Sequence, residues 1–100
     1  MAKKNSRNNE FLNKVRESTS PKIYELILKL VNEDREDLAE IVVKIDYLLE
    51  YTSKCIKHRD YEEAREVLGS AKERMDKLRK EGIEVEYLEY LYGGIYEKCK

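Results

Sequence analysis

The sequence predicts an all-α protein, an antiparallel helical bundle of three long or four shorter helices. Two apolar stripes with helical spacing carry this prediction. The first runs through Leu38, Val42, Ile45, Leu49, Thr52 and Ile56, and the second through Tyr61, Ala64, Leu68, Ala71, Met75 and Leu78. Steps of three and four residues keep such side chains on one face of a helix, so each stripe is expected to face a partner helix.

The chain is expected to form one domain over residues 9–100, because 100 residues suffice for a single modest core. Residues 1–8 are polar and predict a disordered basic tail. A short helix is expected over residues 9–17. Ser20 as N-cap and Pro21 as the first helical residue predict the next start. Residues 23–31 are aliphatic enough to suggest a strand, but the Glu25–Lys29 pair, four residues apart, favours a helix.

A long helix is expected over residues 35–58, and it is apolar around most of its circumference. Asn32-Glu33-Asp34 before it reads either as a turn with Asp34 as the cap or as a continuation of the preceding helix. Apolar residues flank its core stripe on both sides: Ile41, Leu48 and Cys55 on one flank, and Val43, Tyr47 and Tyr51 on the other. One short chain has few helices to cover so much apolar surface, so part of it is expected to meet another molecule.

Two further helices are expected after this one. Asp60 followed by Glu63 forms an acidic capping box, and Gly82 suits the left-handed residue that ends a helix. A last helix is expected over residues 84–99. Its inward residues are Val85, Leu88, Leu91, Ile95 and Cys99, and Gly93-Gly94 weakens it or permits close packing or a kink.

Composition indicates a cytoplasmic protein. Charged residues make up 41% of the chain with a net charge of −1, and Gln is absent. Abundant Lys and Glu with depleted Gln is typical of hyperthermophiles. No apolar run is long enough to span a membrane, and no apolar stretch follows the basic N-terminus as in a signal peptide. Cys55 and Cys99 are therefore expected to be reduced thiols, with a Cys55–Cys99 disulfide as the alternative that a hyperthermophilic source would allow.

The sequence predicts no catalytic, cofactor or metal site and no small-molecule substrate. His58-Arg59-Asp60 matches the catalytic tripeptide of protein kinases, but the glycine-rich loop and strand lysine of those enzymes are absent. Acidic clusters at residues 33–37 and 62–66 lack histidine and the spacing of a calcium-binding loop, and helix starts explain them. Neither core stripe contains an ionisable group other than Tyr61. A small divalent-metal-dependent enzyme is left as a remote alternative.

The best functional candidate is a surface. Val43, Tyr47 and Tyr51 predict a protein interface, either between copies of the chain or with another protein, because tyrosine is enriched at interfaces. The alternative is single-stranded nucleic acid, since aromatic rings beside cations can stack bases and contact phosphates. That interpretation assigns Lys44, Tyr47, Tyr51, Lys54 and His58 to the contact, together with Lys3, Lys4 and Arg7 of the tail.

Part of the chain resembles two helical families. Asp60-Tyr61-Glu62-Glu63-Ala64, with Ala71 seven residues after Ala64, resembles the second helix of a tetratricopeptide-type hairpin. The stretch from Arg35 through the His58-Arg59 turn to Leu78 resembles archaeal translin-like proteins, in which such a turn joins two long helices to an acidic one. Translin-like proteins are about twice as long, and the glycine usual after the arginine is missing. This resemblance implies an all-helical oligomer that binds single-stranded RNA or DNA.

Overall fold

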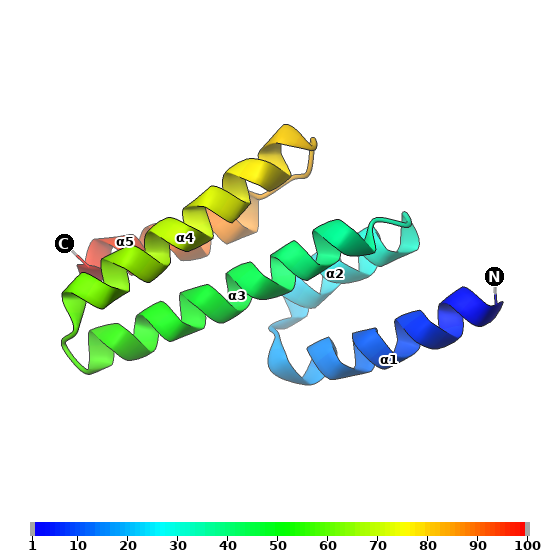
Figure 1. The fold of residues 1–100 in the computed structure, drawn as a ribbon, viewed down its shortest axis with the longest axis horizontal. Helices are drawn as coiled ribbons and strands as arrows, with labels where there is room; N and C mark the ends of the chain where they lie inside the picture. The colour runs from blue at the N-terminus through cyan, green and yellow to red at the C-terminus, as the bar shows by residue number, and fades with distance from the viewer. Residues whose placement is uncertain (1, 100) are drawn as a thin grey trace. The chain divides into compact units, whose positions relative to one another are not determined.

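The computed structural model describes the backbone of residues 2–99 and the side chains of residues 10–99. Over residues 2–99 it contains five helices and no strand (Figure 1), which confirms the all-α prediction. The helices are α1 (Ala2–Ser18), α2 (Pro21–Asn32), α3 (Glu36–Lys57), α4 (Tyr61–Lys80) and α5 (Glu86–Cys99). The predicted number of three or four is wrong, because the short N-terminal helix and the turn at residues 33–35 are both separate features.

Contacts divide the chain into two compact units, Met1–Val43 and Lys44–Lys100, with the boundary inside α3. The first holds α1, α2 and the start of α3, and the second holds the rest of α3 with α4 and α5. A single domain over residues 9–100 stays a prediction. None of the helices over residues 2–99 is long and apolar enough to cross a membrane.

In the first unit, Ser20 begins α2 as predicted. Its hydroxyl oxygen accepts a hydrogen bond of 3.4 Å from the Ile23 amide, and Pro21 occupies the first turn. The buried side chains of α2 are Ile23, Ile27, Leu30 and Val31. Helix α1 packs against α2 and buries Leu12 and Val15. It begins at Ala2, upstream of the expected start at Asn9. The side chains of residues 1–9 lie outside the described residues, so the disorder expected for residues 1–8 stays a prediction.

Helix α3 buries its predicted core stripe. Leu38, Val42, Ile45, Leu49 and Thr52 are all at most 3% exposed, and Ile56 is half-buried. Thr52 is the buried polar residue of this stripe, and its hydroxyl donates to the Leu48 carbonyl at 2.8 Å. This bond satisfies a donor that would be costly to leave unpaired in the core.

In the second unit, α4 buries Ala64, Leu68, Ala71, Met75 and Leu78 as predicted. Tyr61, the first residue of that predicted stripe, is 39% exposed instead. It occupies the first position of α4, where the helix has just begun. Asp60 caps α4 as predicted, since its carboxylate accepts a hydrogen bond of 3.3 Å from the Glu63 amide.

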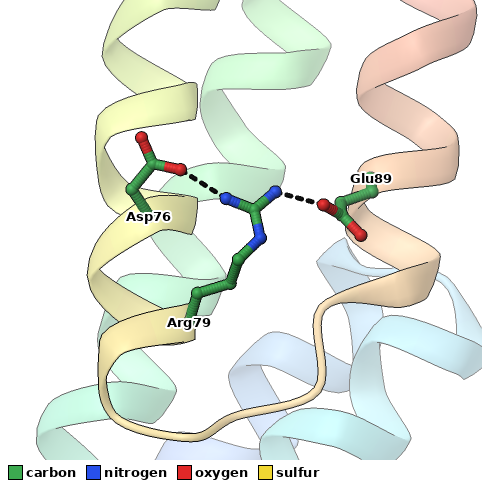
Figure 2. A network of polar contacts seen from close by, with 3 residues as sticks. All are labelled: Asp76, Arg79 and Glu89. Carbon is green, nitrogen blue, oxygen red and sulfur yellow. Dashed lines mark hydrogen bonds and ion pairs between the residues drawn. The ribbon is translucent and has the colours of Figure 1, made fainter.

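Helix α5 packs along α4, with Leu88 and Cys99 buried and Leu91 and Ile95 half-buried. It continues through Gly93-Gly94 without interruption. Arg79 near the end of α4 lies between Asp76 of the same helix and Glu89 of α5, and its guanidinium bonds to both carboxylates (Figure 2). At the other end of the helix pair, Arg65 donates to the Cys99 carbonyl at 3.2 Å. Polar contacts therefore fix both ends of the α4–α5 pair.

Three helices end in the same way, each with a left-handed residue. The φ angles are 66° at Asp34, 62° at Arg59 and 77° at Gly82. The amide after each of these residues donates back across the last turn: Arg35 to Leu30 at 2.8 Å, Asp60 to Cys55 at 2.9 Å and Ile83 to Leu78 at 3.0 Å. These bonds satisfy carbonyls that the helix end leaves unpaired.

Only the third of these endings was predicted. Gly82 is the residue type that a left-handed position favours. The sequence leaves open whether Asn32-Glu33-Asp34 is a turn with Asp34 as the cap of the next helix or a continuation of α2. The structure has a turn, in which Asp34 closes α2, and α3 begins at Glu36. At Arg59 an ordinary side chain occupies a backbone conformation that costs L-residues about 1–2 kcal/mol.

Candidate functional site: the tyrosine surface of α3

Four side chains on the outer face of α3 and that of His58, in the turn directly after α3, follow one another at helical spacing. Lys44, Tyr47, Tyr51, Lys54 and His58 are spaced by three and four residues and are all exposed; together we call them the tyrosine surface. Tyr47 is 54% exposed and Tyr51 is 36% exposed. The core stripe of α3 faces inward, and the same helical period carries these five residues to the outside. The structure therefore brings together the α3 residues that the sequence assigned to nucleic-acid contact.

The two tyrosine rings touch edge to face. Their centroids are 6.2 Å apart and their planes are inclined by 64°. The Lys44 ammonium lies 5.3 Å from the centroid of the Tyr47 ring, within the range of a cation–π contact. Neighbouring groups on α3 therefore restrict the Tyr47 ring, although more than half of its surface is open to solvent.

Tyr51 is also tied to α4. Its hydroxyl donates a hydrogen bond of 3.1 Å to Oε2 of Glu63. This bond and the negative charge of Glu63 raise the pKa of the Tyr51 phenol, because both favour its neutral form. Tyr51 thus links α3 to α4, whereas Tyr47 makes no hydrogen bond to another helix among the described residues.

The tyrosine surface borders two hollows in the second unit. The larger has a volume of about 390 Å³ and is lined by Tyr51, Lys54, Cys55, His58, Asp60 and Glu63. The smaller has a volume of about 200 Å³ and is lined by Tyr47, Glu50, Tyr51 and Lys54. Tyr51 and Lys54 line both, so the hollows are neighbours.

Charges of both signs surround the larger hollow. Asp60 caps α4 and Glu63 accepts from Tyr51, so each carboxylate already has a partner within the chain. Lys54 and His58 also line this hollow, and neither forms an ion pair within the described part of the chain. The mixture of charges disfavours a ligand of strong single charge.

Cys55 is the thiol that lines the larger hollow. Cys55 is only 7% exposed, and burial, followed by the charges of Glu63 and Asp60, raises the pKa of its thiol, so it is a poor nucleophile. Over the residues whose side chains are described, no group of three or more His, Cys, Asp or Glu residues is placed to hold a metal ion.

Not every residue assigned from sequence belongs to this surface. Val43 is half-buried and lies in the first unit. The side chains of Lys3, Lys4 and Arg7 lie outside the described residues. Sequence reasoning treated Asp60 as a cap and Cys55 as core, and missed that both line a hollow. Asp60 lies beyond the end of α3 and gives no periodic signal, because the turn at Arg59 brings α4 back beside α3. Cys55 lies four residues after Tyr51 on α3, so helical spacing alone could have placed it beside Tyr51.

Comparison of the chain with protein-family models, curated proteins and solved structures finds no match.

Proposed function

We propose that this chain is a non-catalytic protein-interaction module that self-associates through the tyrosine surface. One observation carries the proposal: Tyr47, 54% exposed, projects from the same helix face that borders a hollow of about 390 Å³. Large aromatic residues seated in a partner's pocket supply much of the binding energy at protein interfaces. A projection and a hollow on one surface are the two halves of such a contact.

Self-complementarity supports a second copy of the chain as the occupant of this surface. In a two-fold dimer the same patch meets itself, so each projection must find a hollow within the patch. The patch also carries groups of both signs, as self-pairing requires. Basic side chains (Lys54 and His58) lie beside carboxylates (Glu50, Asp60 and Glu63). Reversing one copy therefore brings cations toward carboxylates. The net charge of −1 adds little repulsion between copies.

Analytical ultracentrifugation of the full chain tests this proposal. Wild-type protein is expected to associate with increasing concentration, and Tyr47→Ala is expected to weaken association through the tyrosine surface by at least about tenfold. Tyr61→Ala is the matched control, because Tyr61 is 39% exposed on α4 but lines neither hollow. A wild-type chain that stays monomeric at millimolar concentration would overturn the proposal, as would equal effects of the two substitutions.

Binding of single-stranded nucleic acid is the second candidate. Lys44 over the Tyr47 ring, with Lys54 and His58 further along, offers cations beside a stacking platform. The resemblance to translin-like proteins points the same way. Glu50, Asp60 and Glu63 along the same hollows argue against it, because carboxylates repel phosphates.

Fluorescence anisotropy with labelled single-stranded RNA and DNA tests this second candidate. It predicts binding that weakens with added salt and with loss of Lys3, Lys4 and Arg7. Lys44→Ala and Lys54→Ala should each weaken binding, while Lys72→Ala, an exposed lysine of α4, should not. Absence of binding even at low salt would exclude nucleic acid as the partner.

A further inference from the structure

The outer face of α5 carries a ridge that the tyrosine surface does not include. Glu86, Tyr90, Gly94 and Lys98 are each four residues apart and all exposed, and we call them the α5 ridge. Residues at this spacing form one continuous row along a helix. The buried residues of α5, Leu88 and Cys99, lie on its opposite side. Within the described residues of the second unit, all four ridge positions are open to solvent.

Tyr90 is the most exposed large hydrophobic residue of the described chain, at 75%. Its ring stacks on that of Tyr87, with centroids 6.2 Å apart and an interplanar angle of 23°, so it stands on the helix in a restricted position. A restricted, exposed aromatic ring loses little freedom when a partner covers it.

Gly94 provides a gap in the same row. Apart from its chain neighbours and the backbone of its own helix turn, a methyl group added at Gly94 would meet no described atom within 4 Å, so packing against the rest of the chain does not require glycine there. Glycine is less favourable than alanine in the interior of a helix. Its absence of a side chain does, however, let an aromatic ring from outside approach the helix backbone closely.

The ends of the ridge carry opposite charges. Glu86 in the first turn of α5 and Lys98 in the last are about 18 Å apart along the helix. Neither forms an ion pair with another described residue. Both are placed favourably toward the dipole of their own helix, and that effect accounts for their positions without any partner. The even spacing of the four residues also lets a reversed copy of the row place Glu86 opposite Lys98.

We propose that the α5 ridge packs antiparallel against the α5 ridge of a second copy of the chain. Four evenly spaced positions, reversed, place the first opposite the fourth and the second opposite the third. Tyr90 of each copy then lies over Gly94 of the other, and Glu86 of each copy faces Lys98 of the other. The row is complementary to itself in both shape and charge, as a two-fold contact requires.

This contact is separate from the tyrosine surface and does not depend on it. A chain with two self-complementary surfaces assembles beyond a dimer, because each surface recruits a different copy. The wild-type chain is therefore expected to form tetramers or longer assemblies. Disabling either surface should leave a dimer held by the other one.

Charge exchange within the α5 ridge is the decisive experiment, carried out in the Tyr47→Ala background so that only the ridge supports association. Sedimentation should give a dimer for Tyr47→Ala alone. Adding Glu86→Lys or Lys98→Glu should weaken that dimer by at least about tenfold, because like charges then face each other. Adding both should restore it. If the charges serve only the helix dipole, the double exchange gives the least stable helix and no recovery, which would overturn the proposal.

Gly94→Ala gives an independent readout, with Gly69→Ala of α4 as its control, because a methyl group meets nothing within 4 Å at either position. Both substitutions should raise the Tm of the monomer by a few degrees, since alanine favours the helix. Only Gly94→Ala should weaken association. Equal association of the two variants would contradict the ridge contact.

The outcomes separate the two surfaces. A Tyr47→Ala chain that is monomeric at millimolar concentration would overturn the ridge and leave the tyrosine surface in place. Unchanged assembly of Tyr47→Ala, lost on adding Glu86→Lys, would overturn the tyrosine surface and support the ridge.

Discussion

The Tyr51 hydroxyl donates a 3.1 Å hydrogen bond to Glu63 across the turn between α3 and α4. The two residues lie twelve positions apart, and the turn that joins them contains Arg59 in a left-handed conformation. This bond holds one of the two tyrosines of the surface in place and leaves Tyr47 as the projecting one. The turn at Arg59 places Glu63 beside Tyr51, and the bond between them fixes the orientation of Tyr51 at the edge of the larger hollow.

The Tyr51–Glu63 bond predicts a pH dependence of stability. Glu63 raises the pKa of Tyr51 above the ordinary tyrosine value of about 10. The folded chain then keeps the phenol proton where the unfolded chain loses it. The resulting stabilisation is fully present below about pH 10 and is lost as the pH rises through the folded pKa of Tyr51. Thermal unfolding of wild type and Tyr51→Phe should therefore differ most near neutral pH and converge in strong alkali. A constant difference across the range would contradict this assignment.

Arg59 predicts a stabilising substitution. Arg59→Gly should raise the free energy of unfolding by about 1 kcal/mol, because glycine adopts φ near +62° without steric strain. Asp34→Gly should give a smaller gain, since aspartate tolerates this region better than arginine. Gly82→Ala should have the opposite sign. Urea denaturation of the three variants checks the order, and a destabilised Arg59→Gly would show that the arginine side chain contributes more than its backbone costs.

Substitution of the adjacent residues Leu78 and Arg79 should lower the free energy of unfolding by very different amounts. Leu78 is fully buried, so Leu78→Ala should lower the free energy of unfolding by about 2–5 kcal/mol. Arg79 bonds to Asp76 and Glu89 at the surface, with all three side chains more than 40% exposed, so Arg79→Ala should cost much less. The effect of Arg79→Ala should also shrink at high salt, whereas that of Leu78→Ala should not. Denaturation at two ionic strengths distinguishes them.

The two cysteines predict slow thiol chemistry. Both are free and buried, and burial raises the pKa of Cys55. An alkylating reagent should therefore modify native protein slowly and both thiols rapidly after denaturation. The intact mass of unreduced protein measures the alternative directly, because a Cys55–Cys99 disulfide would lower it by two hydrogens and block labelling.

Local signals in the sequence predicted the start of α2 at Ser20 and of α4 at Asp60, and the end of α4 at Gly82. Each depends on a residue whose side chain, or lack of one, satisfies a helix end by itself. The endings at Asp34 and Arg59 carry no such residue. They arise because the following helix must turn back over the preceding one, and that requirement is tertiary.

The candidate site likewise has a part that the sequence predicted and a part that depends on tertiary structure. Helical period alone places Lys44, Tyr47, Tyr51 and Lys54 on one face of α3, with His58 at the next position of the row in the turn after it, and all five are exposed. The hollow beside them depends on α4, because Asp60 and Glu63 reach it only through the turn at Arg59. The α5 ridge is recognised from the exposure of its residues and from the open space around Gly94. The sequence alone left open whether Gly93-Gly94 weakens the helix, permits close packing or kinks it.

Isotope-filtered NMR on a mixture of labelled and unlabelled chains tests the central claim most directly. Nuclear Overhauser contacts that cross between copies identify the side chains in an interface. The account predicts contacts from the Tyr47 ring of one copy to Tyr51, Lys54 and His58 of the other, and their loss in Tyr47→Ala. Intermolecular contacts that spare all of these residues, or none at millimolar concentration, would contradict it.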